Sequence, residues 1–266
     1  TGDGNDNRFR GNDGVDTIDG GGGTDRVEFH NSTNGIEVDL ALGAGQVLDD
    51  GFGLGNTETL TSIEDVTGSL NDDAISGDSG ENRLAGLAGN DTLSGGAGID
   101  TLYGGVGNDS LAAGDEGFFF GTQSQALFGE NGNDTLQGGA SADLLDGGAH
   151  NDSLVGGAGD DTLSGGGGHD ILLGGTGSDL LYGDGGNDTL SGTGSNDTLH
   201  GGTGNDSLIA GSGNSLLAGG TGNDTIRGSQ ADLNGDTLTM RRARDDETFH
   251  ALIDKHSTLD PRSEEH

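Results

Sequence analysis

Aspartate recurs at nine-residue intervals through most of the second half of the chain, and this spacing is the feature that could carry chemistry. The stretch 129–227 divides into eleven consecutive blocks that read Gly-Gly-x-Gly-x-Asp-x-Leu-x or close to it, as in 156–164 and 201–209. Within a block the glycines suit a tight turn, the Asp at position six offers carboxylate oxygens, and the apolar residue at position eight suits a core. A short period kept in frame is typical of a solenoid.

Two shorter runs of the same block precede this array, and a last irregular block ends it. In the first run we place Asp6 at position six, with Arg10 as one extra residue before the next block. Asn82, Gln125 and Ser215 stand at position six in other blocks, and we leave them out of the candidate ligands because they carry no carboxylate. The candidate metal-ligating residues are Asp6, Asp16, Asp25, Asp73, Asp91, Asp100, Asp109, Asp134, Asp143, Asp152, Asp161, Asp170, Asp179, Asp188, Asp197, Asp206, Asp224 and Asp236.

Positions seven to nine of each block predict a short strand, in which position eight points to one side and its neighbours to the other. Position eight is Leu, Ile or Val in every assigned block except the first, where this frame gives Arg8. Two blocks then make one turn of eighteen residues, with two parallel sheets and the leucines stacked between them. The predicted fold is an all-β parallel β-roll with a C-terminal cap.

The segments between the repeat runs differ from them in composition. The stretch 29–67 alternates like a strand at 36–40 and 60–66, and 113–119 is an insertion that contains part of the Phe118–Phe120 cluster. We divide the chain into first repeats (1–28), an inserted β segment (29–67), a second array (68–112), an insertion with a degenerate repeat (113–128), the main array (129–239) and a cap or secretion signal (240–266).

The charge of the chain limits its partners. Forty-six Asp and Glu residues face 10 Lys and Arg residues, for a net charge of −36. Nucleic acid and anionic membranes are polyanions, so the sequence argues against both and favours a multivalent cation. There is no cysteine for a disulfide framework, and no apolar run long enough to predict a membrane span. The first residues begin in mid-repeat, so we expect the chain to be a piece of a longer protein.

Calcium is the cation that the block favours. Position-six carboxylates one turn apart should stack at the strand spacing of about 4.8 Å, where two charges repel by roughly 3 kcal/mol at an effective dielectric of about 20. A hard cation between successive turns reverses that sign, and Ca²⁺ accepts several carboxylate and carbonyl oxygens at flexible geometry. Magnesium demands a tighter octahedron and should substitute badly. The number of stacked pairs predicts about 8–14 calcium ions.

With these blocks the chain resembles the repeats-in-toxin (RTX) family, also called hemolysin-type calcium-binding proteins. The resemblance implies export in an unfolded state by a type I secretion system, followed by folding outside the cell where calcium is abundant. It also implies that position-six Asp side chains and loop carbonyls together ligate each ion. Stretches 36–40 and 59–69 are similar to a segment that precedes the repeats in serralysin-type proteases and alginate epimerase modules.

We expect this segment to have no catalytic role, because neither His-Glu-x-x-His nor Gly-x-Ser-x-Gly occurs. The only lysine is Lys255, which argues against a phosphate-binding loop. His150 and His169 occupy turn positions four and five, where we interpret them as tolerated substitutions. After residue 239, Phe249, Leu252 and Ile253 have the spacing of a short amphipathic helix among basic residues, which suits a cap.

The sequence therefore predicts a calcium-dependent folding, export and spacing module of a secreted protein. The alternative is a polysaccharide- or surface-binding accessory module. An alginate binder should show basic residues on a sheet face, and the long array has only Arg227. An ice-binding threonine file stops after Thr203 and Thr221, since Gly185 precedes them one turn earlier. The sequence does not specify the activity of the parent protein.

Overall fold

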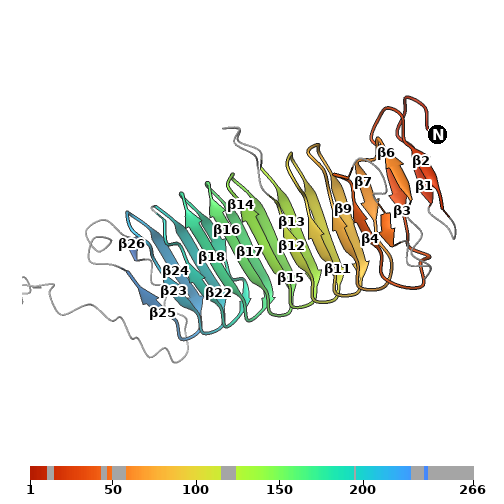
Figure 1. Cartoon of the computed structure of the whole chain (residues 1–266). Helices are drawn as coiled ribbons and strands as arrows, with labels where there is room; N and C mark the ends of the chain where they lie inside the picture. Colours follow the sequence, from red (N-terminus) through yellow and green to blue (C-terminus); the bar gives the residue numbers. More distant parts are fainter. Residues whose placement is uncertain are drawn as a thin grey trace, which may run out of the picture.

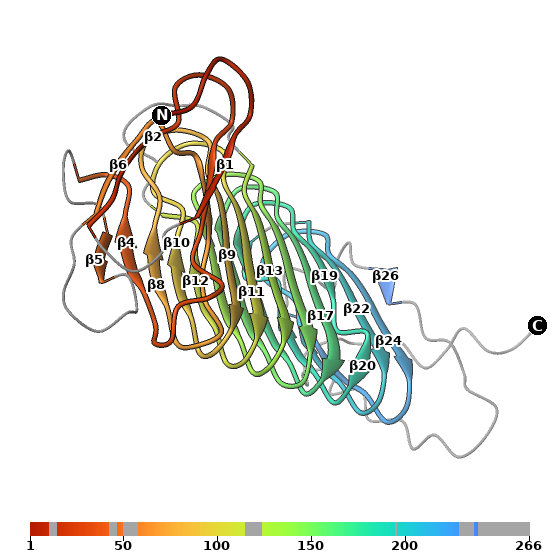
Figure 2. The same cartoon turned by 90° about the vertical axis from the view of Figure 1, so that its right-hand side faces the viewer.

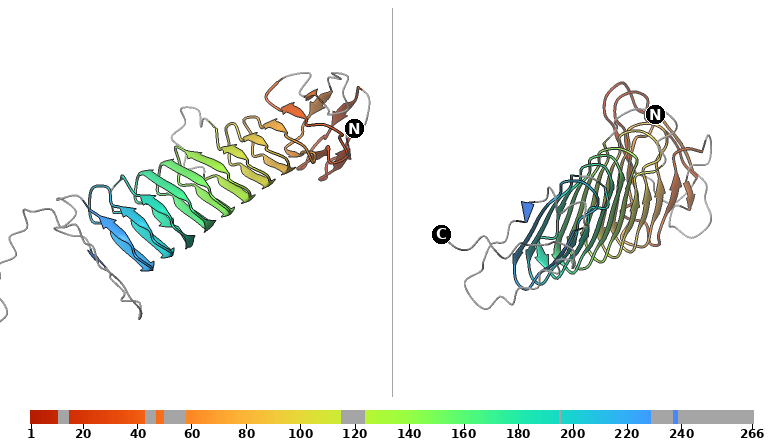
Figure 3. Two further views of the ribbon diagram at one scale, coloured as in Figure 1. Left: turned by 90° about the horizontal axis from the view of Figure 1, so that it is seen from below. Right: turned by 90° about the vertical axis from the view of Figure 1, so that its left-hand side faces the viewer.

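The computed structural model describes residues 1–10, 15–42, 47–49, 58–114, 124–194, 196–228 and 237–238. These residues form a long parallel β-solenoid and contain no helix (Figure 1). The chain winds from the N-terminus at one end to the last repeats at the other, as the views in Figure 3 also show. The predicted all-β parallel roll is therefore confirmed. Asp236, Phe118–Phe120 and the segment 240–266 lie outside the described residues.

Two long sheets face each other along the solenoid (Figure 2). In spatial order, sheet 1 contains β1 (Arg8–Arg10), β3 (Arg26–Glu28), β7 (Asp65–Thr67), β9 (Arg83–Ala88), β11 (Thr101–Val106), β13 (Ala126–Asn131), β15 (Leu144–Ala149), β17 (Thr162–Gly168), β19 (Leu180–Tyr182), β22 (Thr198–Thr203), β24 (Leu216–Thr221) and β26 (Thr237–Leu238), with β20 (Gly185–Gly186) beside β17 and β22. Sheet 2 contains β25 (Thr225–Arg227), β23 (Ser207–Ile209), β21 (Thr189–Ser191), β18 (Ile171–Thr176), β16 (Ser153–Ala158), β14 (Thr135–Gly139), β12 (Ser110–Ala112), β10 (Thr92–Ser94), β8 (Ala74–Ser76), β4 (Glu37–Asp39) and β5 (Val47–Asp49). A separate two-stranded sheet pairs β2 (Thr17–Asp19) with β6 (Thr59–Thr61).

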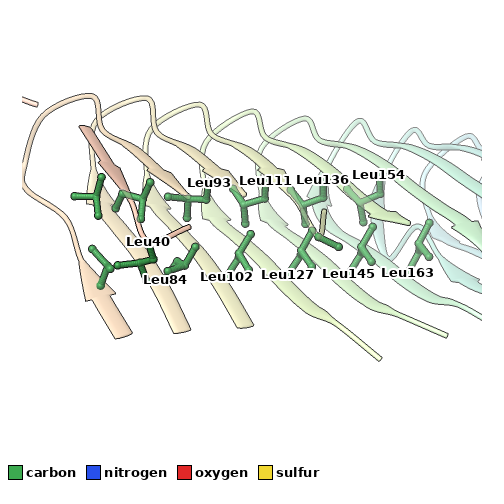
Figure 4. Packing of buried hydrophobic residues seen from close by; sticks show 14 of the residues in the cluster. Leu40, Leu84, Leu93, Leu102, Leu111, Leu127, Leu136, Leu145, Leu154 and Leu163 are labelled. Carbon is green, nitrogen blue, oxygen red and sulfur yellow. The ribbon is translucent and has the colours of Figure 1, made fainter. Parts of the chain in front are cut away.

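The register of the sheets follows from the length of one turn. Leu163 on β17 pairs in parallel with Leu181 on β19, and Leu154 on β16 pairs with Leu172 on β18, so equivalent residues lie two blocks apart. Position-eight leucines of both sheets point into the shared interior, where those between Leu84 and Leu208 are at most 1% exposed. Figure 4 shows the two rows facing each other. Each buried leucine contributes about 1.5–3 kcal/mol, so the core alone is thin for a chain so rich in glycine.

The first block has a different frame from the one predicted. Arg8 pairs with Arg26 and Phe9 with Val27, so Phe9 occupies position eight and packs against the core. Asn7, not Asp6, then aligns with Asp25 at position six. The apparent exception at Arg8 disappears, and Arg10 is the ninth residue of its block rather than an extra one. The prediction placed Asp6 one position too far along because Asp at position five looks the same in sequence as Asp at position six.

The stretch 29–67 contributes rungs to the roll itself. Val38 on β4 pairs with Ile75 on β8 in sheet 2, and Val66 on β7 pairs with both Val27 and Leu84 in sheet 1. Its remaining described strands are β5, which pairs antiparallel with β4, and β6. The seven-residue insertion leaves the register intact, because β11 and β13 still pair directly across it.

Candidate calcium sites on two edges

The loops between the sheets form two edges of the solenoid, which we call edge 1 and edge 2. Edge 1 holds the loops that leave sheet 1 and enter sheet 2, and edge 2 holds the loops that return. Edge 1 carries an uninterrupted file of position-six aspartates: Asp73, Asp91, Asp109, Asp134, Asp152, Asp170, Asp188, Asp206 and Asp224. Edge 2 carries Asp25, Asp100, Asp143, Asp161, Asp179 and Asp197, together with Asn82, Gln125 and Ser215. Asp16 precedes β2 of the two-stranded sheet and belongs to neither file.

Most position-six side chains of the two files are buried, and the aspartates among them accept a hydrogen bond from the turn before. Asp134 and Asp152 are at most 2% exposed. The backbone N–H of Asp134 donates to Oδ1 of Asp152 at 2.8 Å, and the backbone N–H of Asp152 donates to Oδ1 of Asp170 at 2.8 Å. The same bond links Asp143 to Asp161 on edge 2 at 2.8 Å. The carboxylates therefore stack along the axis as predicted, but inside the loops instead of on an open surface.

At many of these aspartates the second carboxylate oxygen is buried without a hydrogen-bond donor. Buried Oδ2 atoms with no such partner belong to Asp25, Asp91, Asp109, Asp134, Asp152, Asp161, Asp170, Asp179, Asp188 and Asp206. A buried acceptor with no donor is costly, and an ionised one more so. The repetition of the same buried oxygen at turn after turn fits a site for a cation better than a local defect.

Loop carbonyls line the space beside these oxygens. A Cβ added to Gly129, at position one, would lie 2.4 Å from Oδ2 of Asp134 and 2.6 Å from the carbonyl oxygen of Gly147 one turn on. The glycine thus keeps open a small space bounded by a carboxylate oxygen and a carbonyl oxygen. Calcium binds to such oxygens at about 2.3–2.6 Å, so the donor set fits a calcium ion.

No three Asp, Glu, His or Cys side chains converge among the residues that the structure describes. A cation at an edge would therefore take only one or two carboxylates and complete its shell with backbone carbonyls, as Ca²⁺ readily does. This set contains neither the imidazole nor the thiolate ligands that zinc prefers.

Burial raises the pKa of many position-six carboxyls, such as those of Asp152 and Asp161, above the ordinary 3.8, and neighbouring carboxylates raise several of these pKa values further. The pKa reaches about 7 for Asp91, Asp152 and Asp161 and about 6 for Asp134, Asp188 and Asp206. For Asp152 the largest cause of the raised pKa is desolvation. The hydrogen bond from the Asp134 backbone lowers the pKa in part, and the negative charges of Asp134 and Asp170 raise it further. The free carboxylates are thus held in an environment that disfavours their charge unless a cation compensates it.

Asp73 differs from these aspartates, because both of its carboxylate oxygens accept hydrogen bonds from the protein. Its Oδ1 accepts hydrogen bonds from the Ile36 backbone at 2.9 Å and the Ser69 hydroxyl at 2.7 Å. Its Oδ2 accepts from the Ser69 backbone N–H at 2.6 Å. Because both oxygens are satisfied in this way, Asp73 differs from the aspartates that follow it on edge 1.

Two features of the edges were not predicted. Glu64 takes position six on edge 2, where its Oε2 accepts from the backbone N–H of Asp25 at 2.8 Å. On edge 1 the position-five side chains form a second ladder, whose side-chain acceptors are Asp72, Asn90, Asn108, Asn133, Asn151, His169, Asn187 and Asn205. The recurrence of Asn at position five in alternate blocks was the available signal.

His169 belongs to this ladder, because its Nδ1 accepts from the backbone N–H of Asn187 at 2.8 Å. His150 has a positive φ of 84° at position four. Both residues therefore act as turn residues in this structure. On the neighbouring loop face Thr203 pairs with Thr221 and with Gly185, so the threonine file has the two rungs expected from the sequence.

Comparison with known proteins gives the family. A family model for the RTX calcium-binding nonapeptide repeat (4 copies) matches residues 1–31, 67–102, 85–116, 128–163, 146–181, 164–199, 182–217 and 209–232. The fold is also similar to the crystal structure of a hyperactive, Ca²⁺-dependent, β-helical antifreeze protein from an Antarctic bacterium, with 24% identity over 86% of this chain and 77% of that one and a TM-score of 0.45. No curated protein matches the chain significantly. The chain belongs to the RTX calcium-binding nonapeptide repeat family, and its repeats bind multiple calcium ions.

Proposed function

We propose that the chain is a calcium-operated folding, export and spacing module of a secreted protein, with the position-six aspartates of both edges as its calcium ligands. The observation that carries this proposal is the file of buried Oδ2 atoms without donors, repeated along the solenoid. Without a cation, each turn must bury an uncompensated charge or take up a proton. With calcium, the same atoms become ligands that join neighbouring turns. The repeats are structural in this proposal, and the segment carries no catalytic site.

The charge and the repeat structure support the export part of the proposal. A chain of net charge −36 that lacks its cations is self-repelling and poorly able to collapse. A solenoid gains stability only as neighbouring turns join, so calcium-free chains should stay extended until they meet calcium. Such a chain can pass a narrow type I secretion channel and then fold in the calcium-rich exterior. Among the described residues no helix is long and apolar enough to cross a membrane.

The test is a calcium titration of the metal-free chain followed by circular dichroism. We expect little β signal in excess chelator and a sigmoidal gain as free calcium rises, because each filled turn stabilises its neighbours. Magnesium at the same concentrations should give a much smaller gain. A chain that is fully β-structured in chelator would contradict the proposal. Export is tested by comparing secretion of the full chain by cells with and without a type I system.

The polysaccharide-binding alternative has one specific observation in its favour. Within the described residues, all cationic side chains except Arg227 lie on the outer face of sheet 1, near the N-terminal end: Arg8, Arg10, Arg26 and Arg83. Arg83 lies 4.7 Å from the ring centroid of Tyr103, which stacks on Phe128 with centroids 5.1 Å apart. Basic and aromatic groups on one sheet face suit an acidic glycan. Glu28 and Asp65 pair with Arg8 and Arg26, so part of this charge is already neutralised.

This second candidate is tested by an alginate pull-down in calcium, with chelator as the comparison. Binding that depends on this face should fall severalfold in Arg83→Gln and stay unchanged in Arg227→Gln, which removes a charge from sheet 2 instead. Equal losses in both variants, or no retention of the wild-type chain, would argue against a glycan site here.

A further inference from the structure

A buried amide stands at position six of one turn on edge 2. Gln125 is 1% exposed, and its Oε1 accepts a hydrogen bond from the backbone N–H of Asp100. Its Nε2 donates to the carbonyl oxygen of Gly98, at position four of the preceding turn. The amide therefore bonds to two backbone groups of its neighbouring turn, one as acceptor and one as donor.

A regular turn uses the first of these contacts and lacks the second. The Oδ1 of Asp161 accepts from the backbone N–H of Asp143 at 2.8 Å, as the Oε1 of Gln125 does from Asp100, but Oδ2 of Asp161 has no donor. An ionised carboxylate can only accept, whereas an amide carries two N–H donors on its nitrogen. The nitrogen of Gln125 thus supplies a donor to a carbonyl oxygen of the preceding turn, which an ionised carboxylate at position six could not do.

Asn82 also donates its side-chain amide to a carbonyl of the preceding turn, but its oxygen accepts from its own turn. Its side chain is buried, Oδ1 accepts from the backbone N–H of Asp78 at 2.8 Å, and Nδ2 donates to the carbonyl oxygen of Glu64 at 3.1 Å. Glu64 belongs to the preceding turn of edge 2. The same carbonyl oxygen also accepts the backbone N–H of Arg83, so the amide of Asn82 adds a second hydrogen bond between these two turns.

We propose that the turns closed by Asn82 and Gln125 are metal-free joints, in which a side-chain amide takes the place of the calcium ion. Edge 2 then loads its ions in separate stretches, with the longest running from Asp143 to Asp197. Edge 1 loads as one continuous file from Asp91 to Asp224. This inference rests on the proposed calcium-dependent folding and adds to it which turns need no ion.

The location of the amides supports a difference in calcium loading between the two edges. Asn82, Gln125 and Ser215 stand at position six on edge 2, whereas edge 1 carries an aspartate there in every turn from Asp73 to Asp224. In the sequence, the insertion 113–119 lies directly before the block that contains Gln125. At that junction a hydrogen bond built from the chain itself holds adjacent turns together without depending on a complete calcium loop.

The first test is Gln125→Asp, with bound calcium counted by native mass spectrometry and folding followed by circular dichroism. We expect the variant to bind one further ion, because Asp removes the donor to Gly98 and adds a second carboxylate oxygen. The matched control, Asp161→Asn at a regular turn of the same edge, should lose at least one ion. A folded Gln125→Asp variant with an unchanged ion count overturns the inference.

The second test uses the unaltered chain, so it tests the metal-free turns even if the variant does not fold. In calcium-soaked crystals, anomalous scattering should show ions beside Asp161 and none between Asp100 and Gln125 or between Glu64 and Asn82. Ions at either amide with occupancy equal to that at Asp161 overturn the inference. A wild-type chain that folds without any bound calcium contradicts the proposed function itself, which separates the two failures.

Discussion

The two carboxylate oxygens of a position-six aspartate have different roles. One oxygen of Asp152 accepts a backbone hydrogen bond from the previous turn, while the other has no donor and lies in a loop that raises the pKa of the carboxyl to about 7. The first oxygen fixes the register of adjacent turns. The second makes that register unfavourable until a cation or a proton arrives.

This division of roles predicts the effect of Asp152→Asn. The amide should keep the bond from Asp134 but lose the charge that attracts calcium, so the calcium concentration needed for folding should rise severalfold. A calcium titration followed by circular dichroism measures that midpoint. Asp160→Asn is the control, because Asp160 is an exposed position-five residue whose Oδ1 accepts from Ser178. An equal shift in both variants would show that net charge alone sets the calcium response.

The raised pKa values predict a pH dependence for the calcium-free chain. The folded-state pKa of Asp91, Asp152 and Asp161 is about 7, above the ordinary value of 3.8, so protonation favours the folded state. That stabilisation is complete below pH ~3.8 and is lost as the pH rises through 6 to 7. The metal-free chain should therefore gain β signal as the pH falls from 8 to 4.5. Saturating calcium at pH 7.5 should give the β signal without any fall in pH. A metal-free signal that is constant across this range would contradict the assignment.

At the scale of one loop, the three glycines of 165–167 have different tasks. Gly165 leaves room for the carboxylate, since an added Cβ would lie 2.5 Å from Oδ2 of Asp170. Gly166 has a φ of +91° and an added Cβ would lie 2.1 Å from the carbonyl oxygen of Gly148. Around Gly167 no heavy atom lies within 4 Å of an added Cβ. In the consensus Gly-Gly-x, the first glycine thus leaves room beside the carboxylate, and the second allows the positive φ and the close approach to the neighbouring turn.

Three alanine variants test these roles in a single turn. Gly165→Ala should displace Asp170 and raise the calcium midpoint severalfold. Gly166→Ala should destabilise the calcium-loaded fold by about 1–3 kcal/mol through backbone strain, with a smaller effect on calcium binding. Gly167→Ala should change stability by less than about 1 kcal/mol. Denaturant unfolding at saturating calcium and a calcium titration at fixed denaturant measure the two quantities. The idea fails if Gly167→Ala is as damaging as Gly165→Ala.

The elements that sequence could predict are those with a fixed period. Leu163 and Leu181 repeat at eighteen residues, so their pairing and burial follow from alternation within a strand and the length of a turn. Phe9 was missed because a single frame error in a short run moves every assignment by one position. The rung at Val66 was missed because its strand follows a stretch without the glycine pattern. The amide bonds of Gln125 were missed because a Gln at position six falls outside the consensus, and no period predicts which backbone groups its longer side chain reaches.

For the whole molecule, the balance between core and charge decides whether the roll folds. A file of single leucines on each sheet faces a net charge of −36, and the described residues contain few cations to offset it. Under the proposed function, each calcium ion would remove two units of that charge and join two turns. We therefore expect calcium to act on the entire solenoid, because turns stabilise one another only through their neighbours.

The ends of the solenoid are where this mutual support stops. Among the described residues, strand β25 has a neighbour on one side only in sheet 2, and Ile226 on it is only partly buried. An unpaired strand edge and an uncovered core residue invite pairing with other chains. The amphipathic spacing of Phe249, Leu252 and Ile253 and the surrounding basic residues suit a cover for this end, so we propose that 240–266 caps the roll.

Deleting 240–266 should therefore raise the calcium concentration needed for folding severalfold, or cause the folded chain to associate through its exposed edge. Calcium titration and light scattering measure the two outcomes. Deleting only 257–266 removes charged residues but keeps Phe249, Leu252 and Ile253, and it should leave both quantities close to those of the full chain. A chain that lacks 240–266 yet folds at the same calcium concentration and stays monomeric would mean that the repeats end without a cap, and the basic tail would then be better explained as an export signal alone.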